Sequence, residues 1–79
     1  MRRPFTTPAG ITFEPIRNGG YRAKKDGIEF TIWRAVNPTN WGLTARRGEM
    51  ELHRGPSISW RGTRARCAKY ADDILADQW

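Results

Sequence analysis

The chain has 79 residues and a formal net charge of +6, from 14 lysines and arginines against 8 aspartates and glutamates. A chain this short forms one domain with a modest core, because it buries only about 60% of its unfolded surface. No run of 18 apolar residues is present, so we expect no membrane partner. The single cysteine, Cys67, excludes an internal disulfide and suits a reducing interior, which predicts a cytoplasmic location.

Charge is unevenly distributed along the chain. Residues 1–71 carry all 14 cations and five of the acids, whereas the last eight residues carry three acids and no cation. A strongly basic body attracts polyanions, above all nucleic acid. The alternative interpretation is that the positive charge serves only to keep a small protein soluble.

The first 16 residues carry weak structural signals. Residues 1–10 contain two prolines, a glycine and two threonines, which predicts a flexible N-terminal tail. In "ITFEPI", residues 11–16, Ile11 and Phe13 would face one way, but Pro15 lacks a backbone donor and predicts an edge strand at best. We expect residues 11–79 to form a single domain.

The clearest local signal is the hairpin "YRAKKDGIEFTIWRAV", residues 21–36. Asp26-Gly27 is a strong two-residue turn, because both positions tolerate a positive φ. Apolar and polar residues alternate on both sides of it, which indicates two strands with one buried face. The predicted buried residues are Tyr21, Ala23, Ile28, Phe30 and Ile32.

Two more strands are predicted after a turn at "NPTN", residues 37–40. The alternation continues through "WGLTAR", residues 41–46, and resumes after a tight turn at residues 47–48. A loop follows around Pro56, with a short strand at Ser57–Trp60. The predicted inward-facing residues of this region are Trp41, Leu43, Ala45, Met50 and Leu52.

A helix is predicted after Thr63, whose hydroxyl can accept a hydrogen bond from an early backbone amide as the N-cap. Lys69 and Asp73 stand four residues apart and would form a modest surface pair. The apolar face repeats at helical spacing and contains small residues that allow close packing on a sheet. Its members are Cys67, Ala68, Ala71, Ile74 and Leu75.

These elements predict an α+β fold, with an antiparallel β-meander of three to four strands packed in two layers on one C-terminal α-helix. The other sheet face has no second helix to cover it. Trp33 on that face would either stack on a base or anchor a partner, or lie beneath Pro4 or Phe5 of the tail. The face is predicted to hold Arg22, Lys24, Thr31, Trp33, Thr44 and Arg46.

The charges of the predicted helix oppose its dipole. A helix start favours carboxylates and a helix end favours cations. Here the acids lie toward the end, and the start carries Arg61, Arg64 and Arg66.

An anion at the helix start would make this arrangement favourable. Free backbone amides and the positive end of the dipole bind anions together, and Arg54 in the preceding loop would reinforce the site. The alternative is that these arginines form internal ion pairs with Glu49, Glu51 or Asp72.

Catalytic and metal-binding patterns are weak. Cys67 and His53 could form a nucleophile–base pair, but Cys67 lies on the predicted buried face, where a thiol behaves as a small hydrophobe. One cysteine and one histidine fall short of a zinc site. Asp72 and Asp73 are adjacent on a helix and point apart. We therefore expect a protein that is not an enzyme and has no cofactor and no metal.

The order of "GGYRAKKDGIEFTIWR", "WGLTAR" and "TRARCAKYADDILAD" resembles the arm-type DNA-binding domain of phage integrases and the related plant ethylene-response domain. That resemblance implies a three-stranded sheet that enters the major groove and is backed by a helix. Where those families continue with a Gly-Thr-Phe turn and a Thr-x-x-Glu-Ala helix start, this chain has Thr63 and then Arg66-Cys67. The resemblance implies no base-reading residue.

Residues 20–77 are also similar to small orphan accessory proteins of actinobacteriophages. This resemblance implies a non-enzymatic phage protein, in some cases one that interferes with the host, and it implies no site residues. It is carried by Tyr21, Ala23, Gly27, Phe30, Ile32, Arg34, Trp41 and Leu43.

We therefore predict a small basic binding protein, phage-encoded and active in the host cytoplasm, that acts on an anionic target such as nucleic acid. The alternative is a protein-interaction module that meets a host protein or a second copy through the exposed sheet face or an edge strand. A monomer or a weak homodimer is expected. The predicted binding residues are Arg22, Lys24, Trp33, Arg46, Arg54, Arg61, Arg64 and Arg66.

Overall fold

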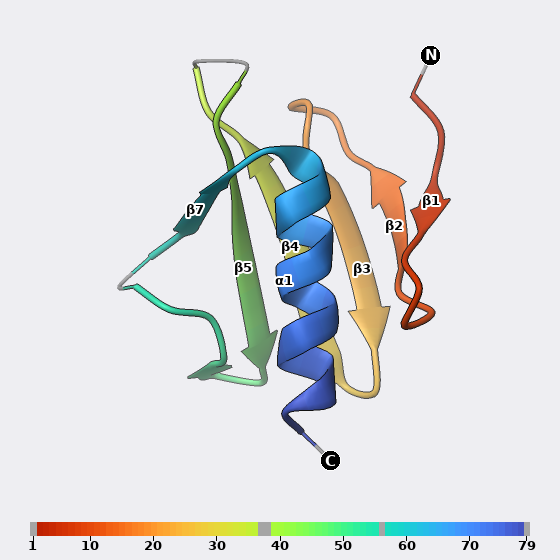
Figure 1. Ribbon diagram of the computed structural model, residues 1–79, viewed down its shortest axis with the longest axis vertical. Coiled ribbons are helices and arrows are strands. Elements are labelled where there is room, and N and C mark those ends of the chain that lie inside the picture. Colours follow the sequence, from red (N-terminus) through yellow and green to blue (C-terminus); the bar gives the residue numbers. More distant parts are fainter. Residues whose placement is uncertain (1, 37–38, 56, 79) are drawn as a thin grey trace.

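A computed structural model describes residues 2–36, 39–55 and 57–78 and has an antiparallel sheet packed against one C-terminal helix (Figure 1). The predicted α+β class is confirmed, although the described residues form a sheet of seven strands instead of three to four. Of the predicted turn at residues 37–40, Asn37 and Pro38 lie outside the described residues. The elements are β1 Phe5–Thr6, β2 Thr12–Pro15, β3 Tyr21–Lys25, β4 Ile28–Arg34, β5 Trp41–Arg47, β6 Met50–Glu51, β7 Ser59–Gly62 and α1 Arg64–Ala76.

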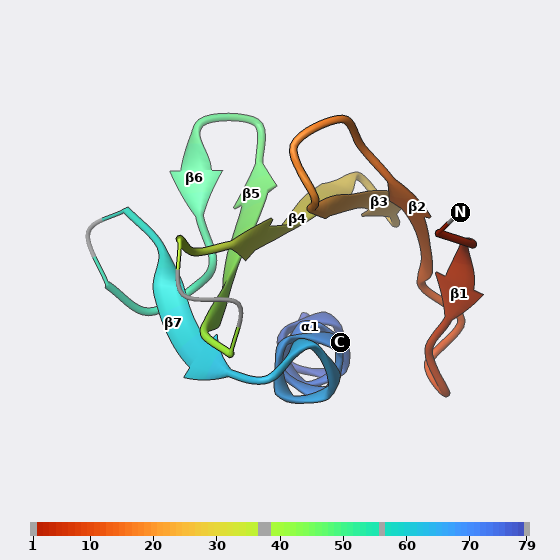
Figure 2. The ribbon, with the colours of Figure 1, turned by 90° about the horizontal axis from the view of Figure 1, so that it is seen from above.

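The sheet is strongly curved, and α1 lies inside its concave face (Figure 2). Strands β1 to β6 follow one another in chain order, and β7 pairs with β5. Both β6 and β7 lie along one edge of β5, with β6 opposite residues 46–47 and β7 opposite residues 41–43. The sheet therefore wraps around the helix from both sides, and its other face is turned outward.

The N-terminal segment joins the sheet. In β1, Phe5 pairs with Phe13 of β2, and their rings stack with centroids 5.3 Å apart. Thr7 donates a hydrogen bond to Asp72 of α1 over 2.5 Å. The predicted flexibility of residues 1–10 stays a prediction, but these contacts place the segment against the sheet and the helix.

Strand β2 lies between β1 and β3 in the strand order, and the expectation of an edge strand is met only locally, at Pro15. Its residues 12–13 pair with β1, whereas Glu14 and Pro15 pair with β3. Pro15 is tolerated because β1 does not extend along that part of β2, so no partner on that side requires its missing N–H group.

The hairpin at residues 21–34 is confirmed in register and turn. Asp26 and Gly27 adopt φ values of 52° and 78°, as the two central residues of this turn type require. Tyr21 faces Ile32, and Ala23 faces Phe30. All the residues predicted to be buried in this hairpin are buried.

The core lies between the concave face and α1. Phe30 is fully buried between Ala23 and Ala45 on the neighbouring strands, so small residues flank the largest side chain in that row. Its ring meets Phe13 edge-on, with centroids 6.3 Å apart. The helix presents small and branched residues to this surface, namely Cys67, Ala71, Ile74 and Leu75.

Three expectations about residues 47–62 need correction. The tight turn consists of Gly48 and Glu49 instead of residues 47–48, because Arg47 still pairs with Met50. Met50 lies opposite Arg47 and remains 64% exposed, because this end of the β5–β6 pair extends past the buried core. Leu52 does pack against the core. The short strand predicted at Ser57–Trp60 begins at Ser59 instead.

The helix begins at the predicted position, and the predicted ion pair on its surface is present. Thr63 is the N-cap, and its hydroxyl accepts a hydrogen bond from the backbone N–H of Arg66 over 3.1 Å. Lys69 and Asp73 form an ion pair at 3.6 Å. Within the described part of the chain, no helical segment combines the length and apolar character that crossing a bilayer requires.

Candidate nucleic-acid interface

The outer sheet face, which is turned away from α1, holds the six residues predicted for it, but acids lie among its cations. Cross-strand partners share a face, and the register places an acid beside each predicted cation. Arg22 faces Glu14, and Lys24 begins a row that alternates in sign across four strands. That row is Lys24, Glu29, Arg46 and Glu51. Three cations and three acids therefore cancel on this part of the outer face.

Trp33 lies on the outer face and is half-buried. Its indole Nε1–H donates a hydrogen bond to the Thr44 hydroxyl over 3.0 Å. Phe5 packs against Phe13 and Tyr21, both of which are buried on the opposite, concave side. The interpretation in which Phe5 covers Trp33 is therefore wrong.

At the helix start, Arg64 contacts aromatic rings, and it contacts no carboxylate of the described residues. Its guanidinium carbon lies 4.8 Å from the ring centre of Phe5 and 5.4 Å from that of Tyr21. One Nη–H group also donates to the Tyr21 hydroxyl over 3.0 Å. These contacts hold the charged group without neutralising it.

Arg61 and the backbone of Arg54 contact Tyr70, at a different place. The guanidinium carbon of Arg61 lies 4.3 Å from the Tyr70 ring centre, and the backbone N–H of Arg54 donates to the Tyr70 hydroxyl over 2.8 Å. The eight predicted binding residues thus form three groups. They are the outer face (Arg22, Lys24, Trp33 and Arg46), Arg64 at the helix start, and the surroundings of Tyr70 (Arg54, Arg61 and Arg66, the last of which also belongs to the first turn of α1).

Internal ion pairing of the helix-start arginines was the alternative interpretation, and it is wrong for the described residues. Among these, the single ion pair joins Lys69 to Asp73. Asp72 instead accepts hydrogen bonds from the Thr7 hydroxyl and, over 3.3 Å, from the backbone N–H of Ala9. The first turn of α1 contains no acid.

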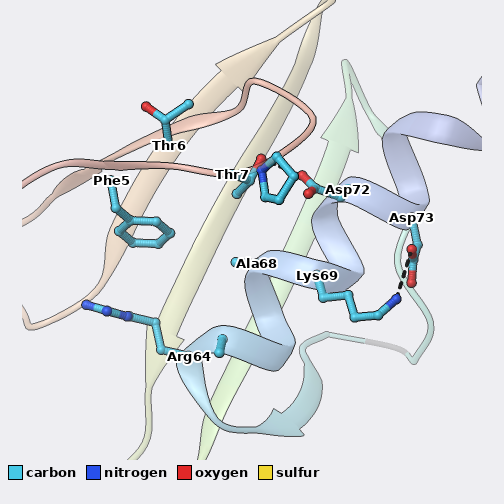
Figure 3. Close-up of a pocket in the computed structure, with 10 residues that line it drawn as sticks. Phe5, Thr6, Thr7, Arg64, Ala68, Lys69, Asp72 and Asp73 are labelled. Atoms are coloured by element: carbon cyan, nitrogen blue, oxygen red, sulfur yellow. Dashed lines mark hydrogen bonds and ion pairs between the residues drawn. The ribbon is translucent and has the colours of Figure 1, made fainter.

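A groove of about 620 Å³ runs between the β1 segment and α1. In Figure 3, Phe5 and Arg64 lie at one end of it, Ala68 faces its middle, and Asp72 lies toward the other end. Since Asp72 is bound to the N-terminal segment and Asp73 is paired with Lys69, neither acid neutralises Arg64.

The structure adds two arginines that the sequence interpretation missed. Arg2 donates hydrogen bonds to the carbonyls of Gly20, over 2.8 Å, and Ile16, and its guanidinium carbon lies 5.1 Å from the Tyr21 ring centre. Arg2 and Arg64 therefore converge on the same ring.

Arg34 is the second addition. Its guanidinium carbon lies 5.9 Å from the ring centre of Trp41, which in turn lies 6.3 Å from that of Tyr21. Rings and guanidinium groups thus alternate across the end of the domain.

These contacts belong to one end of the molecule, where the N-terminal residues, the β2–β3 turn, the end of β4 and the start of α1 lie (Figure 1). None of these segments contains an aspartate or glutamate. We name this region the arginine-rich end, and its cations are Arg2, Arg3, Arg17, Arg34, Arg64 and Arg66.

Cys67 and His53 are each fixed in a structural role. Nδ1 of His53 accepts a hydrogen bond from the backbone N–H of Ala45 over 3.2 Å, and its Nε2 lies 2.9 Å from the carbonyl oxygen of Ser57. Cys67 is fully buried on the helix. Burial raises the pKa of its thiol from 9.0 to about 11, and the nearby positive charge of Arg61 offsets only part of this effect.

We expect the Cys67 thiol to react slowly with iodoacetamide in the folded protein. With a pKa of about 11, only about one thiol in a thousand is ionised at pH 8, and the thiolate is the nucleophile. Because the folded state binds this proton more tightly, stability should fall as the pH rises from about 9 toward 11. Mass spectrometry with and without denaturant measures the reaction, and equally fast labelling of both states would contradict the expectation.

Comparisons with protein-family models, curated proteins and solved structures found no match to this chain.

Proposed function

We propose that this protein binds nucleic acid through its arginine-rich end, chiefly by contacts to phosphate. The observation that carries the proposal is the concentration of six arginines on segments without a carboxylate. Their described partners are aromatic rings and backbone carbonyls, so their positive charge remains available to a polyanion. Phosphate contacts of this kind position a protein and supply most of its sequence-independent affinity.

The reversed charges of α1 support the same proposal. Arg64 and Arg66 lie in the first turn, where backbone amides already favour an anion. A bound phosphate would turn an unfavourable interaction between the dipole and the arginines into a favourable one. The resemblance to phage accessory proteins stays a prediction about origin, on which the binding proposal does not depend.

Fluorescence anisotropy of labelled oligonucleotides, titrated with the protein between about 50 and 200 mM salt, tests this function. Four to six phosphate contacts predict that log affinity falls with log salt at a slope between about −3 and −5. No binding at the lowest salt, or an affinity indifferent to salt, would contradict the proposal and favour a protein partner.

A further inference from the structure

Trp60 is an exposed tryptophan that the proposed phosphate contacts leave unused. It lies in β7 and is 47% exposed. Trp60 pairs with Gly42 of β5, and Gly42 pairs with Trp33 of β4. Since cross-strand partners share a face, the two indoles lie on the outer face on either side of a glycine.

The glycine between them is required by close packing. A Cβ atom at Gly42 would lie 2.3 Å from Cγ2 of Ile58 and 2.8 Å from Cε3 of Trp60, distances that no side chain could keep. The indole of Trp60 therefore rests against the β5 backbone, while nearly half of its surface faces solvent. Trp33 is fixed by its hydrogen bond to Thr44. We name the pair Trp33 and Trp60 the tryptophan platform.

The tryptophan platform adjoins the arginine-rich end through Trp60, which lines one hollow together with Arg66 and Tyr70. Trp33 directly precedes Arg34, but the two side chains lie on opposite faces of β4, because Arg34 pairs with Trp41 on the concave side. The charge-neutral row of Lys24 and Glu29 lies farther along the sheet. A bound strand with a phosphate at Arg66 would thus have a base beside the indole of Trp60.

We propose that the protein prefers single-stranded nucleic acid, whose unpaired bases stack on the tryptophan platform while the arginine-rich end holds the phosphates. This inference rests on the proposed function. A positively charged surface combined with exposed aromatic rings is the usual means of binding single strands, and each stacked base contributes substantially to affinity. Bases inside a duplex are already stacked and paired, so a duplex gains the phosphate contacts but not the platform.

The test compares single-stranded and duplex DNA of equal length by anisotropy, using the wild-type protein and Trp60→Leu. The wild type should bind the single strand at least about 10-fold more tightly, and Trp60→Leu should weaken that binding about 5- to 100-fold. Its duplex affinity should change less than about 2-fold, because no phosphate contact is removed. Trp60→Phe keeps an aromatic face and should retain most of the affinity.

Met50→Ala is the matched control, since it truncates an exposed apolar side chain on β6, and it should change neither affinity. The wild-type protein supplies a readout that needs no variant, because its tryptophan fluorescence should be quenched more by the single strand than by the duplex. Equal wild-type affinities, or an unchanged single-strand affinity in a folded Trp60→Leu, would overturn this inference while leaving the proposed function intact. No binding to either DNA would overturn both.

Discussion

Replacing Arg34, Arg64 and Arg66 with glutamine is expected to weaken nucleic-acid binding about 100-fold at about 0.1 M salt. Each lost phosphate contact should also make the salt slope shallower by about one. The three side chains belong to the arginine-rich end, and none forms an ion pair among the described residues. The triple variant should therefore lose affinity for nucleic acid while its free energy of unfolding changes little. Circular dichroism during denaturation would measure that free energy.

The outer sheet face offers a control with the same change in charge. The triple variant Arg22→Gln, Lys24→Gln and Arg46→Gln also lowers the net charge from +6 to +3. These cations lie beside Glu14, Glu29 and Glu51 across the strands, so we expect less than about a 5-fold loss of affinity. Equal losses in the two triple variants would mean that net charge, and not its location, determines binding.

Phe30→Ala is expected to cost about 3–5 kcal/mol of unfolding free energy. A domain of this length has a stability of about 4–12 kcal/mol, so the variant should lose a large part of it. Phe30 is fully buried between two alanines on neighbouring strands. Those small side chains cannot fill the space that the ring leaves.

Urea denaturation followed by circular dichroism measures this effect. Met50→Ala serves as the control, because Met50 is exposed on β6 and its truncation should change stability by less than about 0.5 kcal/mol. A Phe30→Ala midpoint close to that of the wild type would contradict the packing of the sheet around α1.

Local signals made much of the fold predictable. The Asp26-Gly27 turn, the alternation in β3, β4 and β5, and the Thr63 cap each depend on residues close in sequence. Strand β1 escaped prediction because two residues between prolines show no periodicity, and it is held by long-range contacts of Phe5 and Thr7. The position of β7 was likewise mispredicted, because the loop sequence around Pro56 shows no clear alternation.

The candidate site was less predictable because it depends on register and on the meeting of chain segments. Alternation placed Arg22 on the outer face, but only the pairing of strands revealed Glu14 beside it. Arg2 and Arg64 are far apart in sequence and converge on Tyr21. Arg34 joins them because β4 ends where α1 begins (Figure 1).

The most direct measurement is an NMR titration of isotope-labelled protein with a short oligonucleotide, following the arginine side-chain Nε–Hε signals. Binding at the arginine-rich end predicts that the largest chemical-shift changes occur at Arg34, Arg64 and Arg66. Signals of Arg22 and Arg46, which lie among acids on the outer face, should move little. Changes concentrated on Arg22 and Arg46, or no changes at all, would contradict the account.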